Sequence, residues 1–386
     1  MTARAHTRHR EPSVLSAQRC CTQQPAGNAA LGNKPSRMSG SPLRTAESAL
    51  HREANTALVR AIRKFRIRTW KTYAGARPML ARGVPPWNRH RPHQQRHQMM
   101  TLSEALNDAR RRHVAIGHFN VADLVALKAV TEAARGLKLP VLIGASEGER
   151  GFLGVREIAA VVASLRETLD HPIFLNADHT HSLEGAIAAA EAGFDMIGFD
   201  ASTNPLETNV KLTKQAVEAV KSINRSIVVE GELGNIGSGS EIHDKVPESS
   251  RFLTKAEEAK QFVEATGIDV LAPAVGNMHG LLKSMISGDV KKRLDISRIR
   301  DVAGAAGIPL TLHGGSGTDD GDFQKAILAG MTIVHINTEI RLAWRRGLEA
   351  SLAENPDEVV PYKIYNKPLD EMRKVVSSRL RLFNGV

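Results

Sequence analysis

The chain has 386 residues, of which 42% are hydrophobic and 24% are charged, so it can form a sizeable core in one large domain or two ordinary ones. No run of about 18 apolar residues is present, which excludes a transmembrane helix, and no compact apolar segment follows the N-terminus as secretion would require. The only cysteines, Cys20 and Cys21, are adjacent and support neither a disulfide framework nor a thiolate metal site. We therefore expect a soluble, cytoplasmic protein with no membrane partner.

The formal net charge of +11 is unevenly distributed along the chain. Residues 1–98 hold 19 Lys plus Arg against 3 Glu, about +16, whereas the rest holds 33 basic and 38 acidic side chains, about −5. A mildly acidic body does not indicate a specific nucleic-acid-binding protein, although the basic segment alone would bind polyanions loosely. The composition thus divides the chain near residue 98.

Residues 1–98 are rich in Pro, Ser, Gln, His and Arg, and only scattered apolar residues interrupt them. Such a segment cannot bury enough surface to offset the entropy lost on ordering, so we expect a disordered basic extension. Its composition fits a start codon placed too far upstream, with the true start at Met99 or Met100, which is the interpretation we favour. An Arg-rich organellar transit peptide is the alternative.

A short amphipathic helix is predicted directly after the extension, in TLSEALNDARRR over residues 101–112. Ser103 is the expected N-cap, and Leu102, Ala105, Leu106 and Ala109 have the spacing of one apolar helix face. We expect this helix to close the bottom of the fold that follows.

Strand-like and helix-like segments then alternate eight times. Eight βα units in roughly 250 residues are what a (β/α)8 TIM barrel contains. We therefore expect such a barrel over residues 99–386, with no second domain. A doubly wound open sheet is the alternative. Several predicted helices end at a glycine, as expected of a helix stop: Gly193, Gly267, Gly307 and Gly330. The predicted strands are 114–121, 140–146, 172–179, 196–202, 226–234, 270–277, 309–317 and 332–339. The predicted helices are 123–138, 155–169, 182–193, 205–223, 255–267, 295–307, 321–330 and a last one from about 340.

In a barrel, polar residues at the carboxyl ends of the strands share one site regardless of their distance in sequence. Three of them are histidines that supply neutral nitrogens and leave an open position on a metal such as zinc: His179, His279 and His313. Asp200 and Glu232 either hold the metal in a second position or orient the imidazoles. The full set of polar strand-end residues is Asn120, Ser146, Asp178, His179, Asp200, Glu230, Glu232, Asn277, His279, His313, His335 and Asn337.

Two carboxylates are candidates for proton transfer. Asp178 precedes a predicted metal ligand, which places it close to the cation without requiring it to bind, as suits a general acid or base. Glu241 lies in NIGSGSEIHDKVPESS, a segment that either folds over the site as a lid or is a plain solvated loop. His181 and His243 are interpreted as solvated loop residues, and His113, His118 and His171 receive no role.

An anion site is expected where three strand-end loops converge, since barrels often bind phosphate after strands seven and eight. Lys283 lies four residues beyond His279 and would act as a point charge. No predicted strand contains a lysine for Schiff-base chemistry, so a carbonyl substrate would be activated by the metal. The predicted substrate- or phosphate-binding residues are Gly280, Lys283, Gly314, Gly315, Ser316, His335, Asn337 and Thr338.

From about residue 100 to 386 the sequence resembles the metal-dependent class II ketose-bisphosphate aldolases, which include fructose- and tagatose-bisphosphate aldolases. The motifs that carry the resemblance are GHFNVADL, NADHTHSLEGA, NPLETNVKLTKQAVEAVK, VEGELGNIGSG, GNMHGLLK and LHGGSG. HSLEGA and NVKLTK are closer to the tagatose branch, whereas HGLLK is similar to the fructose branch. The resemblance therefore leaves the sugar open.

The resemblance implies the proton-transferring aspartate at Asp178, and zinc ligands at His179, His279 and His313. It implies the alternative metal position at Asp200 and Glu232, and a lid glutamate at Glu241. It also implies triose-phosphate contacts at Gly280, Gly314 to Ser316 and Thr338, where the family binds a monovalent cation, Na⁺ or K⁺. A homo-oligomer, dimer or tetramer, is a further implication.

This chain departs from the family at three places. In the predicted lid, Ser238, Gly239 and Ser240 precede Glu241, where the family has GG followed directly by an acid. The family's last strand reads NxDT or NxAT, and its first Asn, which touches the bound ketone, is replaced here by His335 in HINT. No arginine obviously matches the distal phosphate contact, for which Lys367 and Arg373 are the candidates. We expect a zinc-dependent ketose-bisphosphate aldolase. The alternatives are an aldolase for another phosphorylated ketose or acceptor aldehyde, and a non-catalytic phosphosugar-binding barrel.

Overall fold

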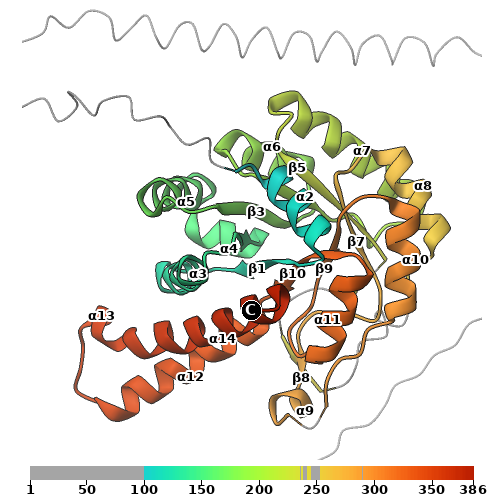
Figure 1. Ribbon diagram of the computed structural model, residues 1–386. Helices are drawn as coiled ribbons and strands as arrows, with labels where there is room; N and C mark the ends of the chain where they lie inside the picture. The colour runs from blue at the N-terminus through green and yellow to red at the C-terminus, as the bar shows by residue number, and fades with distance from the viewer. Residues whose placement is uncertain (1–99, 235, 238–240, 245–252, 289) are drawn as a thin grey trace, which may run out of the picture. The chain divides into compact units, whose positions relative to one another are not determined.

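The computed structural model describes residues 100–234, 236–237, 241–244, 253–288 and 290–386 (Figure 1). The predicted extension over residues 1–98 lies outside the described residues. So do Ser238, Gly239 and Ser240, which precede Glu241 in the predicted lid. Among the described residues, no helix combines the length and apolar character needed to cross a membrane.

Eight parallel strands close into one barrel in the order β1-β10-β9-β7-β5-β4-β3-β2. Each barrel strand pairs with the next barrel strand along the chain, and the last one, β10, pairs with β1. The (β/α)8 prediction is therefore confirmed, and the open-sheet alternative is wrong. Each observed strand overlaps its predicted segment but is shorter or shifted by one residue. The strands are β1 (Ile116–Asn120), β2 (Val141–Ala145), β3 (Ile173–Thr180), β4 (Met196–Phe199), β5 (Val228–Leu233), β7 (Val270–Pro273), β9 (Leu310–Leu312) and β10 (Met331–Ile336).

Helices connect the strands on the outside of the barrel (Figure 1). Their predicted bounds are confirmed to within about two residues, and Gly193, Gly267, Gly307 and Gly330 are the C-caps of four of them. These helices are α3 (Leu124–Leu137), α5 (Val155–Leu169), α6 (Leu183–Ala192), α7 (Leu206–Ile223), α8 (Ala256–Thr266), α10 (Ile296–Ala306), α11 (Asp320–Ala329) and α12 (Thr338–Glu354).

Helix α2 (Leu102–Arg112) closes the N-terminal end of the barrel, as predicted. Its leucines and alanines pack on the residues that begin the strands, among them Ile116, Phe174 and Ile333. The prediction of Ser103 as N-cap was wrong, because Thr101 caps the helix: its hydroxyl accepts from the Glu104 amide at 3.2 Å, and the Glu104 carboxylate accepts from the Thr101 amide at 2.7 Å. This reciprocal pair satisfies two otherwise free amide donors.

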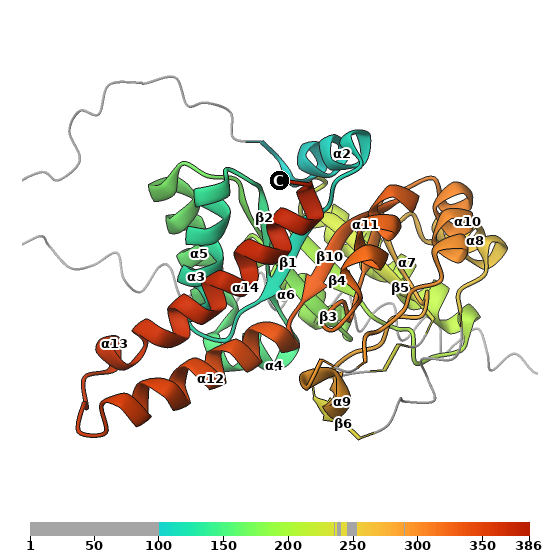
Figure 2. The same cartoon turned by 60° about the horizontal axis from the view of Figure 1, so that its bottom comes forward.

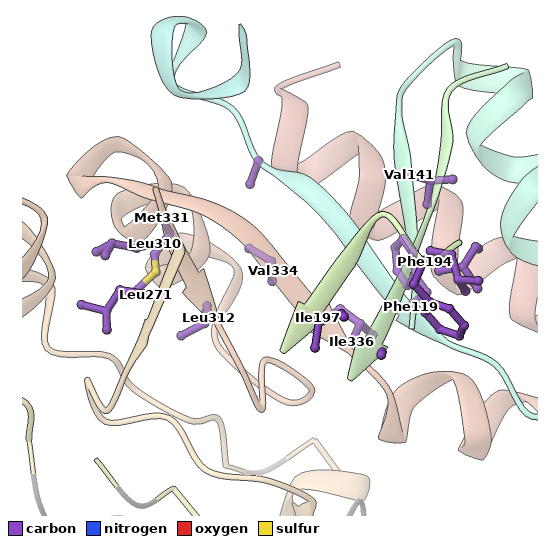
Figure 3. Close-up of a cluster of buried hydrophobic side chains, with 14 of the residues drawn as sticks. Phe119, Val141, Phe194, Ile197, Leu271, Leu310, Leu312, Met331, Val334 and Ile336 are labelled. Carbon is purple, nitrogen blue, oxygen red and sulfur yellow. The ribbon is translucent and has the colours of Figure 1, made fainter. Parts of the chain in front are cut away.

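The main core lies between the barrel and its helices, where the outward-facing strand residues pack (Figure 3). Phe119 of β1 and Ile197 of β4 are fully buried there, as is Phe194 before β4. Because the strands are buried on both faces, their sequences are mainly apolar, and most of their polar residues lie at the site.

Three parts of the fold were not predicted. The helix expected from about 340 is followed by α13 (Pro361–Ile364) and α14 (Asn366–Asn384), and α14 runs back along α12 and packs on α3 (Figure 2). Helix α4 (Glu147–Leu153) follows β2. A small sheet of β6 (Ile242–His243) and β8 (Leu281–Leu282) precedes α9 (Lys283–Ile286) beside the carboxyl ends of the barrel strands.

Candidate active site

Strand β3 presents two consecutive residues, Asp178 and His179, to the same pocket. Successive strand residues normally point to opposite faces of a sheet. Here His179 has a φ of 43°, in the left-handed region, and the pairing of β3 with β4 shifts register between Ala177 and Thr180. The irregularity turns both side chains inward. A non-glycine residue held in this conformation is typical of functional sites.

The three predicted ligand histidines meet at the centre of the barrel mouth. Nε2 of His179 lies 3.1 Å from Nδ1 of His313, and the ring centroid of His279 lies 4.7 Å from that of His179. One ring nitrogen from each residue lies within 4.8 Å of the other two. The sequence separates them by up to 134 residues, and the strand ends bring them together.

Carboxylates orient two of these imidazoles from behind. Glu230 Oε1 lies 2.8 Å from Nε2 of His313, which leaves Nδ1 of that ring facing the other histidines. Asp200 Oδ2 and Glu232 Oε2 lie 3.2 and 3.5 Å from Nδ1 of His179. Such partners fix the tautomer and the orientation of a metal-binding histidine. His179, Asp200 and Glu232 also form a second group of converging donors, so both predicted roles of the two carboxylates have the geometry they need.

The charges of the cluster depend strongly on one another. Burial lowers the pKa of His179, but the carboxylates of Asp178, Asp200 and Glu232 outweigh burial and raise it to about 10. Burial and the charge of Asp200 raise the pKa of Glu232 to about 7. Burial holds the pKa of His279 well below its usual range, so this imidazole is neutral and able to bind a metal.

These residues fit a divalent metal ion. Nε2 of His279 and Oε2 of Glu232 are buried and have no hydrogen-bond partner in the described part of the chain. Buried polar atoms without a partner are costly, and each of these two belongs to a group of possible ligands in which a bound cation would remove that cost. Three imidazole nitrogens with nearby carboxylates are the donor set that zinc prefers.

Asp178 lies beside this cluster with one oxygen bonded and one free. Oδ2 accepts a hydrogen bond from Nδ2 of Asn120 at 2.8 Å, whereas Oδ1 is buried with no hydrogen-bond partner among the described residues. Burial opposes ionisation, but the charges of His179, His118 and His313 and the Asn120 bond hold the pKa of Asp178 well below its usual range. The free oxygen is therefore an ionised proton acceptor at the pocket wall.

His335 lies next to Asp178, in the place where the family motif has Asn. Its ring stacks on His118 at a centroid distance of 3.5 Å and on His313 at 4.0 Å. Burial holds the pKa of His335 well below its usual range, so the ring is neutral at physiological pH. His118, which the sequence left without a role, is thus a buried support of the site.

The pocket encloses about 260 Å³, and its lining includes most of the predicted anion-binding residues: Gly280, Gly314, Ser316, His335, Asn337 and Thr338. Helix α12 begins at Thr338, so the positive end of its dipole faces the pocket. The Ser316 hydroxyl accepts from the amides of Asn337 and Glu339 at 3.2 and 3.3 Å, which leaves its own proton to donate. Backbone and hydroxyl donors of this kind suit a phosphate.

Six predicted site residues are not in the lining of this pocket. His313, Asp200 and Glu232 belong to the groups of possible metal ligands described above, whereas Gly315, Lys283 and Glu241 do not. The Gly315 amide is bonded to the carbonyl of His335 at 3.1 Å. Lys283 is exposed and pairs with Asp244 at 2.7 Å. The Glu241 side chain is exposed, while its carbonyl accepts from the Leu281 amide at 2.9 Å, beside the β6 and β8 pair. Phosphate contacts of Gly315 and Lys283 stay predictions.

Three lining residues received no role from the sequence: Glu147, Gly148 and Arg341. Arg341 lies in the first turn of α12 and pairs with Glu149 at 2.6 Å. His181 is an exposed loop residue, as interpreted from the sequence, and it also lines the pocket, with its ring nitrogens 3.2 Å from Glu147 and 3.4 Å from Asp200. Arg341 follows Thr338 by three residues, just after the end of a predicted strand, and this position could have identified it as a site residue from the sequence.

The two earlier candidates for a distal phosphate contact lie elsewhere. Lys367 pairs with Glu354, and Arg373 pairs with Asp370 at 2.7 Å, on the helices that follow the barrel. Neither residue belongs to the lining of the pocket. Arg341 is the arginine that this pocket offers to an anion.

Comparisons with known proteins show the family to which the chain belongs. The family model described as fructose-bisphosphate aldolase class-II matches residues 100–386. The chain is 34% identical over 290 residues to a fructose-bisphosphate aldolase of Geobacillus stearothermophilus, covering 74% of this chain and 97% of that protein. A fructose-bisphosphate aldolase of Thermus caldophilus is 33% identical over 309 residues, with 75% and 99% covered.

Solved structures are similar as well. The crystal structure of the YdjI aldolase from Escherichia coli K12 has a TM-score of 0.61 and 30% identity, covering 72% of this chain and 94% of that one. A putative fructose-1,6-biphosphate aldolase from Coccidioides immitis has a TM-score of 0.63 and 27% identity, with 73% and 96% covered. The chain therefore belongs to the metal-dependent class II fructose-bisphosphate aldolase family, whose members are carbon–carbon lyases acting on phosphorylated sugars.

Proposed function

We propose that this chain is a zinc-dependent aldolase that reversibly cleaves a ketose 1,6-bisphosphate, fructose or tagatose, between C3 and C4. The products are dihydroxyacetone phosphate and glyceraldehyde 3-phosphate. The observation that carries the proposal is Asp178, an ionised buried carboxylate with one free oxygen beside three converging histidines. A phosphosugar-binding barrel without catalysis needs the anion-binding backbone but no such base.

His179, His279 and His313 would hold the zinc ion, and Glu230 and Asp200 would orient two of the rings. When bound, zinc polarises the substrate ketone and stabilises the negative charge that develops on its oxygen. No barrel strand carries a lysine, so the strands offer no amine for a Schiff base.

Asp178 moves the proton. In cleavage, Oδ1 accepts the proton of the C4 hydroxyl as the C3–C4 bond breaks and C4 becomes the aldehyde carbonyl. The bonding pair goes to C3, which takes up a proton before dihydroxyacetone phosphate leaves. In condensation, the same oxygen returns the proton to the alkoxide that develops at C4. Asn120 holds the other oxygen, so the carboxylate keeps one orientation in both directions.

The two phosphates would be bound at different parts of the pocket. Gly280, Gly314, Ser316 and Thr338 present amide and hydroxyl groups for the triose phosphate. Arg341 presents a guanidinium for the distal phosphate, for which a planar fork of donors is well suited. Glu241, the second candidate for proton transfer, would exchange the proton on the hydroxymethyl carbon of dihydroxyacetone phosphate, the former C3 of the ketose.

His335 supports a second candidate, an aldolase for a different acceptor aldehyde. The imidazole fills more of the pocket than the family's Asn and offers one donor in its neutral form. The family resemblance also supports a homo-oligomer, dimer or tetramer, which sedimentation of the purified protein would measure.

The test is aldol cleavage of fructose and tagatose 1,6-bisphosphate, with the metal content measured on the same preparations. We expect a chelator to abolish cleavage, zinc or cobalt to restore it, and borohydride added with substrate to leave activity unchanged. Borohydride trapping of a lysine would contradict the metal mechanism. Cleavage of neither sugar, together with turnover of another phosphorylated ketose, would favour the second candidate.

A further inference from the structure

Lys292, which the mechanism above does not use, is buried beside the site. It precedes α10, and only 4% of it is exposed. Its Nζ donates to three main-chain carbonyl oxygens, those of Met278 at 2.8 Å, Gly280 at 2.7 Å and Gly314 at 3.0 Å. In the described part of the chain no carboxylate forms an ion pair with this ammonium, although the negative charge of Glu339 acts on it from nearby. The direct ligands of Nζ are therefore the three carbonyl oxygens.

The three carbonyls belong to the loops that build the site. Met278 and Gly280 flank the candidate ligand His279, and Gly314 follows His313. Gly280 and Gly314 have φ values of 74° and 60°, a region that favours glycine. A Cβ at Gly314 would lie 2.3 Å from the Met278 carbonyl oxygen, so the two loops touch where their carbonyls converge.

The number of acceptors favours the charged form of Lys292. Burial lowers its pKa to about 7. The three carbonyls oppose burial, because an ammonium has three N–H donors, whereas a neutral amine has two and would direct its lone pair at the third oxygen. Converging carbonyl oxygens are also the ligands that replace the hydration shell of a bare alkali cation. Nζ thus has the charge and the ligands of such an ion.

The main chain holds Lys292 in place from both sides. Its amide donates to the Gly317 carbonyl at 2.9 Å, and its carbonyl accepts from the Asp319 amide at 3.1 Å. Both partners follow β9, in the same connection that contains Gly314. The lysine therefore ties the connection after β9 to the loop around His279.

We propose that Lys292 is a tethered monovalent cation that positions the loops carrying His279, His313 and the anion-binding glycines, so that this chain needs no added Na⁺ or K⁺. This proposal depends on the proposed function in one respect, namely that these loops bind the phosphate of the substrate. It departs from the family resemblance, which implies a free monovalent ion. In this chain three oxygens that would bind one already accept from Nζ.

The first test uses the unaltered protein in a buffer whose only monovalent cation is tetramethylammonium, which is too large for the site. Cleavage activity, inorganic phosphate binding and the thermal midpoint are then measured with increasing KCl or NaCl against tetramethylammonium chloride at equal ionic strength. We expect no difference between the salts. A saturable several-fold gain in activity or phosphate affinity with K⁺ or Na⁺ would overturn the proposal.

The second test replaces the lysine. Lys292→Ala opens a cavity, and we expect phosphate affinity and kcat/KM to fall roughly 10- to 100-fold, the range for losing hydrogen bonds to a charged group. Potassium or ammonium chloride should restore much of the loss, and tetramethylammonium should not. Lys292→Met fills the space without charge and should not be rescued. Lys291→Ala, at an exposed neighbour, is the matched control and should behave like the unaltered protein.

The readouts separate the two proposals. If the unaltered protein cleaves no ketose bisphosphate, the proposed function fails, but salt-selective rescue of phosphate binding and of the thermal midpoint in Lys292→Ala would still support the tethered cation. If activity, phosphate binding and the thermal midpoint of Lys292→Ala are the same in potassium, ammonium and tetramethylammonium chloride, Lys292 only fills space and does not act as a cation. If neither variant folds, the salt response of the unaltered protein alone decides.

Discussion

Oδ1 of Asp178 lies 3.5 Å from Nδ1 of His335, although the two residues come from strands that β1 and β2 separate in the barrel. The distance is longer than a hydrogen bond, so the carboxylate oxygen stays free for a substrate proton. The imidazole is neutral and buried, and its Nε2 has no hydrogen-bond partner among the described residues. The pair therefore combines a proton acceptor with a neutral ring that has donor capacity left for substrate.

The first prediction concerns the donor capacity of His335. If the ring donates to the substrate, His335→Asn should keep at least about a tenth of the activity, whereas His335→Phe should lose roughly 10- to 100-fold in kcat/KM, because its ring offers no N–H. Both sugars would be assayed, with zinc measured alongside. A His335→Phe enzyme with full activity and normal zinc would show that His335 only packs against His118 and His313.

The second prediction separates catalysis from binding at Asp178. Removing the carboxylate in Asp178→Ala should lower kcat by at least about a hundredfold, since general acid–base help is worth about 10² to 10⁴ in rate. Zinc content and affinity for dihydroxyacetone phosphate should change little, because the three histidines and the phosphate loops remain. Near-normal turnover would remove Asp178 from the mechanism, and loss of zinc would make it a ligand.

The third prediction assigns the distal phosphate to Arg341. Arg341→Ala should raise KM for a ketose 1,6-bisphosphate roughly 10- to 100-fold, the effect of losing charge-assisted hydrogen bonds, and should leave KM for the 1-monophosphate unchanged. Arg345→Ala is the matched control, since Arg345 is exposed on the same helix and pairs with Glu349. An equal loss for both substrates would mean that Arg341 acts through Glu149 and the pocket wall instead.

The barrel could be predicted because its signals are local. Each strand is a short apolar run and each helix has an apolar face, and glycines such as Gly193 and Gly267 mark the stops. The metal site followed from one further rule, that all strand ends meet at one mouth, so His179, His279 and His313 could be joined without knowing any distance.

Contacts that depend on the path of a loop or on an inward turn could not be predicted. Lys292 reads as a surface residue in the basic run KKR, and only the fold brings its ammonium to three carbonyls. His118 sits in the middle of β1 without a local signal for its stacking on His335. Helix α14 has an apolar face, but nothing in its sequence says that α3 and α12 cover it.

The last prediction tests the boundary of the folded unit, which stays a prediction for residues 1–98. A chain that begins at Met99 should fold, keep its thermal midpoint within a few degrees and turn over at the unaltered rate. The reason is that the family match begins at residue 100 and the capping box of α2 begins at Thr101, so every contact described above lies downstream. Circular dichroism melting and the cleavage assay measure both properties.

A second truncation, which begins at Val114, tests whether α2 belongs to the folded unit. It removes α2, whose Leu102 and Leu106 are buried against the first layer of the barrel, each burial being worth about 1.5–3 kcal/mol. Since the whole stability of a domain is only about 5–15 kcal/mol, this shorter chain should melt far lower or aggregate. Equal stability of the two truncations would mean that α2 does not seal the barrel, and an inactive or insoluble chain from Met99 would place the extension inside the fold.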